Sequence, residues 1–231
     1  MKLNTNSNTY ILAYASLLVI AVAFVLAYFS QALKPIQDKN VALDKKKQII
    51  AALNIRDVND NQVEEYYNKL VEADEIINEK NEVLSAGKPG GENDGFKLNG
   101  GDFKAGKLAL FVCNVDGQKK YVMPVYGMGL WGGISGYIAI NADKETIYGV
   151  YFNHEGETAG LGAEIKDNQK WQQQFCGKHL FADGNQDAVA LSVCKKVDNP
   201  ATQVDGVSGA TLTCDGVTRM IHEGLGKYIV F

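Results

Sequence analysis

The sequence predicts an α+β protein: one N-terminal transmembrane helix followed by a soluble domain with an antiparallel sheet and flanking helices. Three observations lead to this prediction. A charge-free apolar run comes first, at Tyr10–Phe29. Strand patterns joined by turn residues follow from Lys107 onward. Helical patterns stand at the edges of those strands and do not alternate with them, which is typical of α+β domains and not of parallel α/β folds.

The apolar run is long enough to cross a bilayer. Tyr10–Phe29 contains twenty residues, of which only Ser16 is a small polar side chain. At about 1.5 Å rise per residue, this length matches a hydrocarbon core of roughly 30 Å. A signal peptide is the alternative, since "SQA" resembles a cleavage site, but its apolar region is normally shorter, about 7–15 residues. We therefore expect residues 1–33 to be a membrane anchor that Pro35 closes.

The charges around the span do not decide its orientation. Lys34, Lys39 and Lys45–Lys47 follow the span, which by the positive-inside rule favours a cytoplasmic domain. Acidic residues are interleaved with these lysines, and the rule is weak for large domains. The span itself has no ionisable side chain, so we expect any ion translocation to be carried by partner chains.

An extension is predicted between the anchor and the main domain. Val41–Ile55 and Asn61–Leu84 carry apolar residues at helical spacing, which predicts two amphipathic helices. Ser85–Gly101 holds six glycines and a proline, which indicates a loop or linker. We therefore divide the chain after the anchor into a helical extension with a Gly-rich linker, residues 34–101, and a main domain, residues 102–231.

The main domain contains two hairpin signals. "KLALFVCNV" and "QKKYVMPVYG" flank Asp116-Gly117, and "GYIAIN" and "TIYGVYFN" flank Ala142-Asp143. Ala188–Lys195 is predicted to be a further strand. Helices are expected at Gln169–Phe175 and from Thr213 to Tyr228.

Composition narrows the classes of function. The chain of 231 residues has a formal net charge of −4 with its lysines spread out, so nothing indicates nucleic-acid binding. Its four cysteines are far apart and form no Cys-x-x-Cys pair, which argues against a zinc or iron–sulfur site. The same cysteines allow a disulfide but select no pair.

The stretch "VDGVSGATLTCDG", residues 204–216, is the first candidate site. Gly206 and Gly209 permit backbone conformations closed to other residues. Thr211 or Thr213 can cap the helix that follows. The amides and dipole of a helix start favour a phosphate group, although a plain loop with an N-cap explains the same residues.

Two further glycine-containing stretches are candidates. In "NHEGETAGLGAE", residues 153–164, Thr158 and backbone amides can donate hydrogen bonds and Leu161 can form an apolar platform. A polar surface turn is the alternative, and a metal site lacks a third ligand at a recognisable spacing. In "PVYGMGLWGGISGY", residues 124–137, five glycines alternate with aromatic residues that can wall a planar ring or simply pack in the core.

These three stretches, in this order behind one N-terminal span, resemble the NqrC family, the FMN-binding C subunits of the sodium-translocating NADH:quinone oxidoreductases. "DGVSGAT" is similar to the family's flavinylation motif, Asp-x-x-Ser/Thr-Gly-Ala-Thr, whose last threonine is Thr211 here. "HEGETAGLG" is similar to the family loop His-x-x-Glu-Thr-Pro-Gly-Leu-Gly. Ala159 stands where proline is common, which leaves the stiffness of that turn open.

The resemblance implies an electron-carrier subunit with FMN attached covalently to Thr211 through a phosphoester. It also implies attachment by a flavin transferase from FAD, because a threonine hydroxyl is a weak nucleophile and no base is nearby in sequence. On this basis the FMN site is expected to comprise Thr211, Ser208, Gly209, Ala210, Leu212, Thr213, Glu157, Thr158, Leu161, Gly162 and Trp131.

The implied setting is the bacterial inner membrane, with the FMN domain on the outer, periplasmic side. The implied partners are the A, B, D, E and F subunits of the complex, with electrons passing to the FMN of the B subunit and finally to quinone. Two alternatives stay open at this point: the related flavin-carrying G subunit of the ion-pumping ferredoxin:NAD reductase complex, and a flavin-free, membrane-anchored binding module.

Overall fold

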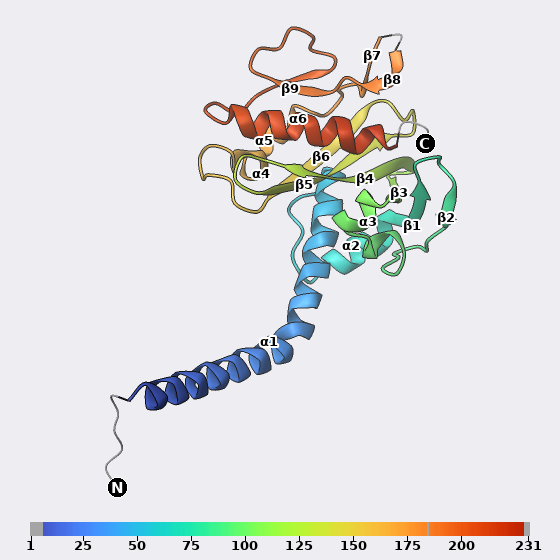
Figure 1. The fold of residues 1–231 in the computed structure, drawn as a ribbon. Helices are drawn as coiled ribbons and strands as arrows, with labels where there is room; N and C mark the ends of the chain where they lie inside the picture. The colour runs from blue at the N-terminus through green and yellow to red at the C-terminus, as the bar shows by residue number, and fades with distance from the viewer. Residues whose placement is uncertain (1–6, 184, 229–231) are drawn as a thin grey trace. The chain divides into compact units, whose positions relative to one another are not determined.

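The computed structural model describes residues 7–183 and 185–228. Its contacts divide the chain into two compact units, Met1–Asp44 and Lys45–Phe231, which we describe separately. Figure 1 shows the course of the chain.

The first unit consists of the long helix α1, Asn8–Ala52, which continues into the second unit. Among the described residues, α1 is the one helix long and apolar enough to cross a membrane, with a mean hydropathy of 2.5 in its most apolar window. The predicted span lies within it. The helix itself runs through Pro35, and the end of the membrane anchor predicted at residue 33 stays a prediction. A proline inside a helix removes one hydrogen bond at a cost of about 3 kcal/mol, and the long helical stretches on both sides offset that loss.

The second unit is built on a six-stranded antiparallel sheet with the strand order β2-β1-β3-β4-β5-β6. The predicted antiparallel sheet with flanking helices is therefore confirmed. The strands are β1 Val71–Asn78, β2 Val83–Ser85, β3 Lys107–Val115, β4 Gln118–Met128, β5 Gly133–Asn141 and β6 Ile147–His154.

Both predicted hairpins are confirmed. Asp116 and Gly117 join β3 to β4 with φ angles of 51° and 80°, the positive values that a two-residue type I′ turn requires. A longer turn that contains Ala142 and Asp143 joins β5 to β6. These two hairpins form the centre and one edge of the sheet.

The predicted helix Asn61–Leu84 was wrong beyond its first third. Helix α2 covers only Val63–Leu70, and the following residues form β1 and β2. A register shift after Val71 disturbs the pairing of β1 with β3. Asp74 and Ile77 are both buried but lie on opposite faces of the regularly paired part of β1. A strand with buried residues on both faces lacks the strict alternation that indicates a strand in a sequence.

The glycine-rich stretch before β3 is a loop that folds around a buried carboxylate. Asp74 is fully buried and accepts hydrogen bonds from the amides of Lys88, Asp94 and Phe96 at 3.1, 3.1 and 3.3 Å. The short helices η1, Gly95–Lys97, and α3, Gly100–Lys104, follow in the same stretch. The boundary predicted at residue 102 stays a prediction.

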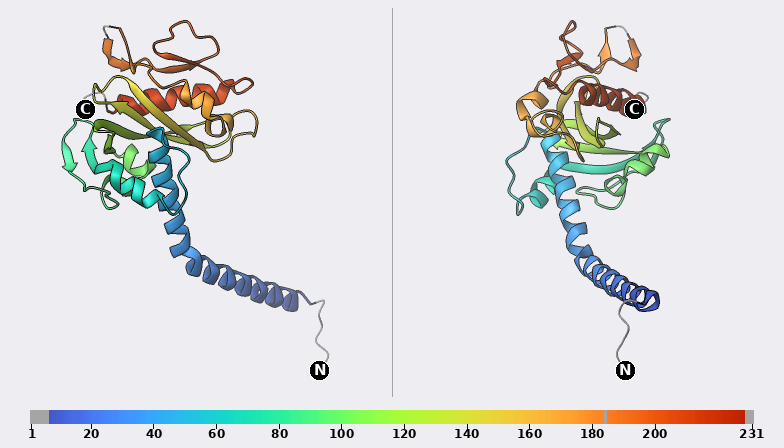
Figure 2. Two further views of the ribbon diagram at one scale, coloured as in Figure 1. Left: turned by 180° about the vertical axis from the view of Figure 1, so that it is seen from behind. Right: turned by 60° about the vertical axis from the view of Figure 1, so that its left-hand side comes forward.

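Helices cover the sheet on both sides (Figures 1 and 2). Helix α6, Thr211–Gly226, packs on β4 and β5, while α4, Glu164–Asp167, and α5, Gln169–Gln173, pack on β6. The end of α1 with α2 lies on the opposite side in the figures, whereas α3 lies near α6, with Phe103 packed against Tyr228. Thus α6 begins two residues before the predicted start, and α5 is confirmed.

Two small sheets lie beyond α6. The strand predicted at Ala188–Lys195 is interrupted: its beginning lies in β8, Asn185–Val189, and its end in β9, Ser192–Cys194. β8 pairs with β7, Phe181–Ala182, and β9 pairs in parallel with β10, Gln203–Asp205. The chain then passes from β10 through a five-residue loop into α6.

Candidate functional site

The three glycine-containing stretches, which lie far apart in the sequence, meet at the start of α6. The amide of Trp131 donates to Oε1 of Glu157 at 2.9 Å, which joins the β4–β5 turn to the β6–α4 loop. The hydroxyl of Thr213 donates to Oε2 of the same carboxylate at 2.6 Å, which joins that loop to α6. A Cβ atom on Gly209 would lie 2.9 Å from Leu161, so the loop before α6 also contacts the β6–α4 loop.

Glu157 is the common partner of these segments. Its side chain is buried, with 7% of the residue exposed. Burial alone raises the pKa of a carboxyl, but hydrogen bonds from Thr213 and from the amides of Trp131, Leu130 and Gly132 outweigh it and lower the pKa of Glu157. The charged form of Glu157 is therefore stabilised by hydrogen bonds from the β4–β5 turn and from α6.

The start of α6 has no side-chain cap. The N-cap residue is Ala210, and no side chain of the described residues bonds there, so the expectation that Thr211 or Thr213 caps the helix was wrong. Thr213 is only 2% exposed and its hydroxyl points to Glu157, whereas Thr211 is exposed. The amides of the first helical turn have no acceptor within a helix. This helix start therefore combines backbone donors, a positive dipole end and the exposed hydroxyl of Thr211.

A cleft of 550 Å³ opens beside the start of α6. It is formed by β9, the loop before α6 and the first turns of α6. Its lining residues are Val193, Cys194, Lys195, Gly206, Val207, Ser208, Gly209, Thr211, Cys214 and Asp215. Lys195 is exposed and brings a cation to the cleft, a residue that sequence reasoning missed because a lysine at a strand end carries no distinctive pattern.

Exposed apolar side chains gather on the same segments. Met128, Leu130 and Trp131 at the β4–β5 turn are 65%, 47% and 69% exposed. Leu161 is 42% exposed and Leu212 is 58% exposed. We call these five residues the apolar platform. Large exposed apolar side chains grouped in this way mark a surface that binds something.

Backbone hydrogen bonds close the turn at Ala159. The carbonyl of Thr158 accepts from the amides of Leu161 and Ala163 at 3.1 and 3.0 Å. Gly160 adopts a φ of 73°, which favours glycine. These contacts hold Leu161 at the surface and Gly162 against Glu157.

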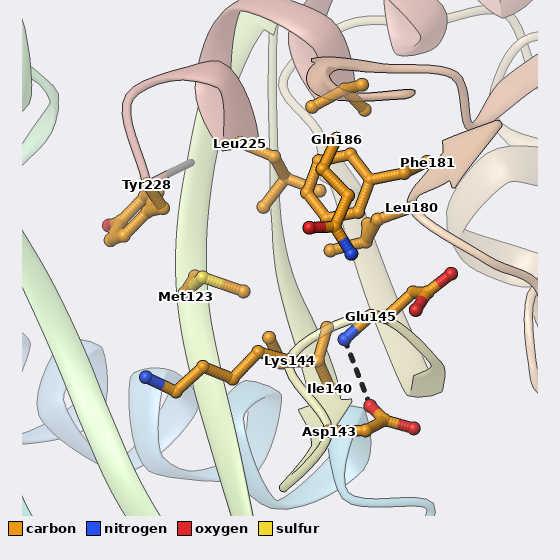
Figure 3. Close-up of a pocket in the computed structure, with 11 residues that line it drawn as sticks. Met123, Ile140, Asp143, Lys144, Glu145, Leu180, Phe181, Gln186, Leu225 and Tyr228 are labelled. Atoms are coloured by element: carbon orange, nitrogen blue, oxygen red, sulfur yellow. Dashed lines mark hydrogen bonds between the residues drawn. The ribbon is translucent and has the colours of Figure 1, made fainter. Parts of the chain in front are cut away.

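Two other hollows lie away from the meeting point of the three stretches. One, of 240 Å³, lies where the C-terminal end of α6 faces the β5–β6 turn and the β7–β8 segment (Figure 3). Figure 3 shows Met123, Leu180 and Leu225 on its walls, with Asp143 accepting from the amide of Glu145 at 3.0 Å near its edge. The other, of 550 Å³, runs between α3 and the middle of α6.

The four cysteines are free, and Cys194 and Cys214 line the cleft beside α6. The described residues contain no cluster of three or more side chains suited to hold a metal ion.

The residues fit a flavin mononucleotide. The first-turn amides of α6 and Lys195 suit its phosphate, the cleft has the volume of a small-molecule site, and the apolar platform suits a flat ring system.

The fold and this site define the chain as an FMN-binding domain behind a candidate membrane helix. The family model of the FMN-binding domain matches residues 129–226. The C subunit of the Na(+)-translocating NADH-quinone reductase of Haemophilus ducreyi is 31% identical over 99% of this chain and 95% of its own length. The corresponding protein of Pseudomonas aeruginosa is 29% identical over 97% and 94% of the two chains. The chain belongs to the NqrC family, the C subunits of the Na(+)-translocating NADH-quinone reductases.

Solved structures agree with this assignment. The crystal structure of the C subunit from Parabacteroides distasonis superposes with a TM-score of 0.77 at 36% identity, covering 86% of this chain and 96% of that chain. The crystal structure of NqrC from Shewanella oneidensis gives a TM-score of 0.65 at 27% identity, covering 82% and 97%.

Proposed function

We propose that this chain is an electron-carrier subunit of a Na(+)-translocating NADH:quinone reductase and that it carries FMN as a phosphoester on Thr211. The observation that carries the proposal is the contrast between two neighbouring hydroxyls at the start of α6. Thr211 is exposed on the cleft, while Thr213 is buried and donates to Glu157. Of these two hydroxyls, only that of Thr211 is accessible to a modifying enzyme.

The attachment step balances with FAD as the donor. The Thr211 oxygen forms a bond to the flavin-side phosphorus of FAD, the bond from that phosphorus to the bridging oxygen breaks, and AMP leaves with this oxygen. The proton of the hydroxyl passes to a base of the flavin transferase, because a threonine hydroxyl needs such a base. The resulting phosphodiester carries one negative charge, which the start of α6 stabilises by about 0.3–1 kcal/mol.

The remaining residues of the site bind the phosphate of FMN and orient its ring. The first-turn amides of α6, preceded by Ser208, Gly209 and Ala210, lie at the phosphate end of the site, with Lys195 nearby. The apolar platform with Thr158 forms the surface for the ring. The bound FMN supplies the redox chemistry, and the protein fixes its place relative to other carriers. Electron transfer requires no acid–base pair.

We further propose the setting that the family implies. Helix α1 anchors the chain in the bacterial inner membrane, and the FMN domain lies on the outer side. The partners are the A, B, D, E and F subunits, and the electrons pass to the FMN of the B subunit. Because the predicted span has no ionisable side chain, sodium passes through the partner subunits.

Fluorescence after denaturation tests the attachment. The protein is produced with its flavin transferase, run on an SDS gel and illuminated with ultraviolet light. We expect a fluorescent band in the wild type and in Thr211→Ser, which keeps a hydroxyl, and none in Thr211→Ala. Mass mapping of the peptide that contains Thr211 identifies the site. A colourless wild type supports the flavin-free binding module, and a fluorescent Thr211→Ala refutes the attachment residue.

A further inference from the structure

We propose that Glu157 is the positioning residue of the FMN site. It fixes the start of α6 and the apolar platform relative to each other and does not itself contact the flavin. The inference rests on the proposed function. Both oxygens of its carboxylate already have protein donors, Trp131 on Oε1 at 2.9 Å and Thr213 on Oε2 at 2.6 Å. A carboxylate with both oxygens occupied and 7% of the residue exposed has little surface left for a ligand.

The site of this carboxylate is built by glycines. A Cβ atom on Gly129 would lie 2.4 Å from Oε1 of Glu157, and one on Gly162 would lie 2.5 Å from Oε2. Side chains at either place would displace the carboxylate. Two glycines from two different loops therefore leave the space that Glu157 fills, and this explains glycine at both positions by close approach to a side chain instead of to a ligand.

The contacts of Glu157 fix the two halves of the proposed FMN site against each other. Thr213 lies two residues after the attachment residue Thr211, so holding its hydroxyl sets the first turn of α6. The amides of Leu130, Trp131 and Gly132 belong to the turn that carries part of the apolar platform. One carboxylate thus links the phosphate end of the site to its ring end.

Glu157 also leaves the helix start open. Its carboxylate accepts from the Thr213 hydroxyl. It does not accept from the backbone amides at the start of α6, as a side-chain cap would. An acidic group that capped the helix would compete with the phosphate for the same amides. By using a hydroxyl as its donor, Glu157 anchors the helix while the amides at its start stay available.

The test uses the full-length protein in detergent with its flavin transferase and FAD. The initial rate of FMN attachment and the fluorescence anisotropy of the attached flavin are measured for Glu157→Gln and Thr213→Val. We expect each variant to slow attachment about tenfold, as the loss of one charge-assisted hydrogen bond predicts, and to lower the anisotropy because the ring loses its fixed platform. The double variant should lose little more than either single one, since both remove the same contact.

Two variants distinguish the positioning role of Glu157 from the general effect of losing one negative charge. Asp187→Asn removes the same charge from an exposed residue outside the site and should leave rate and anisotropy unchanged. Thr213→Ser keeps the hydroxyl and should restore both to wild-type values. If Glu157→Gln does not fold, as circular dichroism would show, Thr213→Val and Thr213→Ser carry the test.

The outcomes distinguish this inference from the proposed function. A wild type that takes up no FMN refutes the proposed function. A wild type that is labelled, together with Thr213→Val labelled at the same rate and anisotropy, overturns the positioning role of Glu157. Failure of Thr213→Ser to recover the wild-type anisotropy also overturns it, because the hydroxyl would then not be the group that matters.

Discussion

Replacement of Gly162 by alanine should destabilise the protein through a contact that is visible only in three dimensions. The new Cβ atom would lie 2.5 Å from Oε2 of Glu157 and 2.7 Å from the hydroxyl oxygen of Thr213. Both distances are shorter than nonbonded contacts allow, so the 2.6 Å hydrogen bond between these side chains must break or lengthen. The backbone at Gly162 has no positive φ, so the effect comes from the contact alone.

The magnitude follows from two opposing terms. Loss of a hydrogen bond to a buried carboxylate costs about 1.5–3 kcal/mol. Alanine in place of glycine lowers the entropy of the unfolded chain and returns about 0.4–1 kcal/mol. The net loss of about 1–2 kcal/mol corresponds to a decrease of about 2–8 °C in Tm for a domain of this size.

The assay is thermal unfolding of the full-length protein in detergent, followed by tryptophan fluorescence. Gly156→Ala is the matched control: it lies in the same loop, has no positive φ, and its added Cβ atom meets nothing within 4 Å. The control should melt at the wild-type temperature or slightly above it. If Gly162→Ala and Gly156→Ala melt at the same temperature, Glu157 and Thr213 are not packed as described.

Two further predictions concern other carboxylates and pH. Asp74→Asn places an amide donor against backbone donors, since both oxygens of Asp74 accept from amides. We expect a loss of about 2–3 kcal/mol and faster trypsin cleavage after Lys97, an exposed lysine of the same loop stretch, with exposed Asp187→Asn as the unaffected control. For Glu157, the folded pKa lies below the usual value of 4.5, so its charge stabilises the fold above pH 4.5 and this contribution is lost as the pH falls through the folded pKa. The stability advantage of the wild type over Glu157→Gln should therefore shrink in thermal melts as the pH falls below 4.5. A difference that stays constant as the pH is lowered until the protein unfolds would contradict the assignment.

The elements that sequence reasoning predicted correctly are those set by local chemistry. The long N-terminal helix follows from an uninterrupted apolar run, and the β3–β4 hairpin follows from Asp116-Gly117, whose φ angles are both positive. The errors arose where tertiary contacts override local patterns. In β1 both faces carry buried residues, so the strict alternation of a strand is lost, and Asp74 is buried because a later loop supplies its donors. A single sequence contains neither fact.

In the candidate site, too, the sequence predicts the features that local residues set and misses those that tertiary contacts set. Glycine-rich loops and a threonine near a helix start are readable from the sequence, and so is the resemblance that ranks Thr211 first. The donors of Glu157 come from the β4–β5 turn and from α6, 26 residues before it and 56 residues after it. No local pattern connects such positions, so its role could not be predicted. Lys195 entered the site for the same reason, through the fold and not through a motif.

The geometry of α6 explains why two threonines so close in sequence have different roles. Successive residues of an α-helix are rotated by about 100°, so side chains two residues apart point about 200° apart, to nearly opposite sides of the helix. Once Thr213 faces Glu157 and the core, Thr211 must face the solvent and the cleft. The buried contact of one hydroxyl therefore determines the exposure of the other. A change that rotated the first turn of α6 would alter both at once, which is why anchoring Thr213 and modifying Thr211 are expected to depend on the same carboxylate.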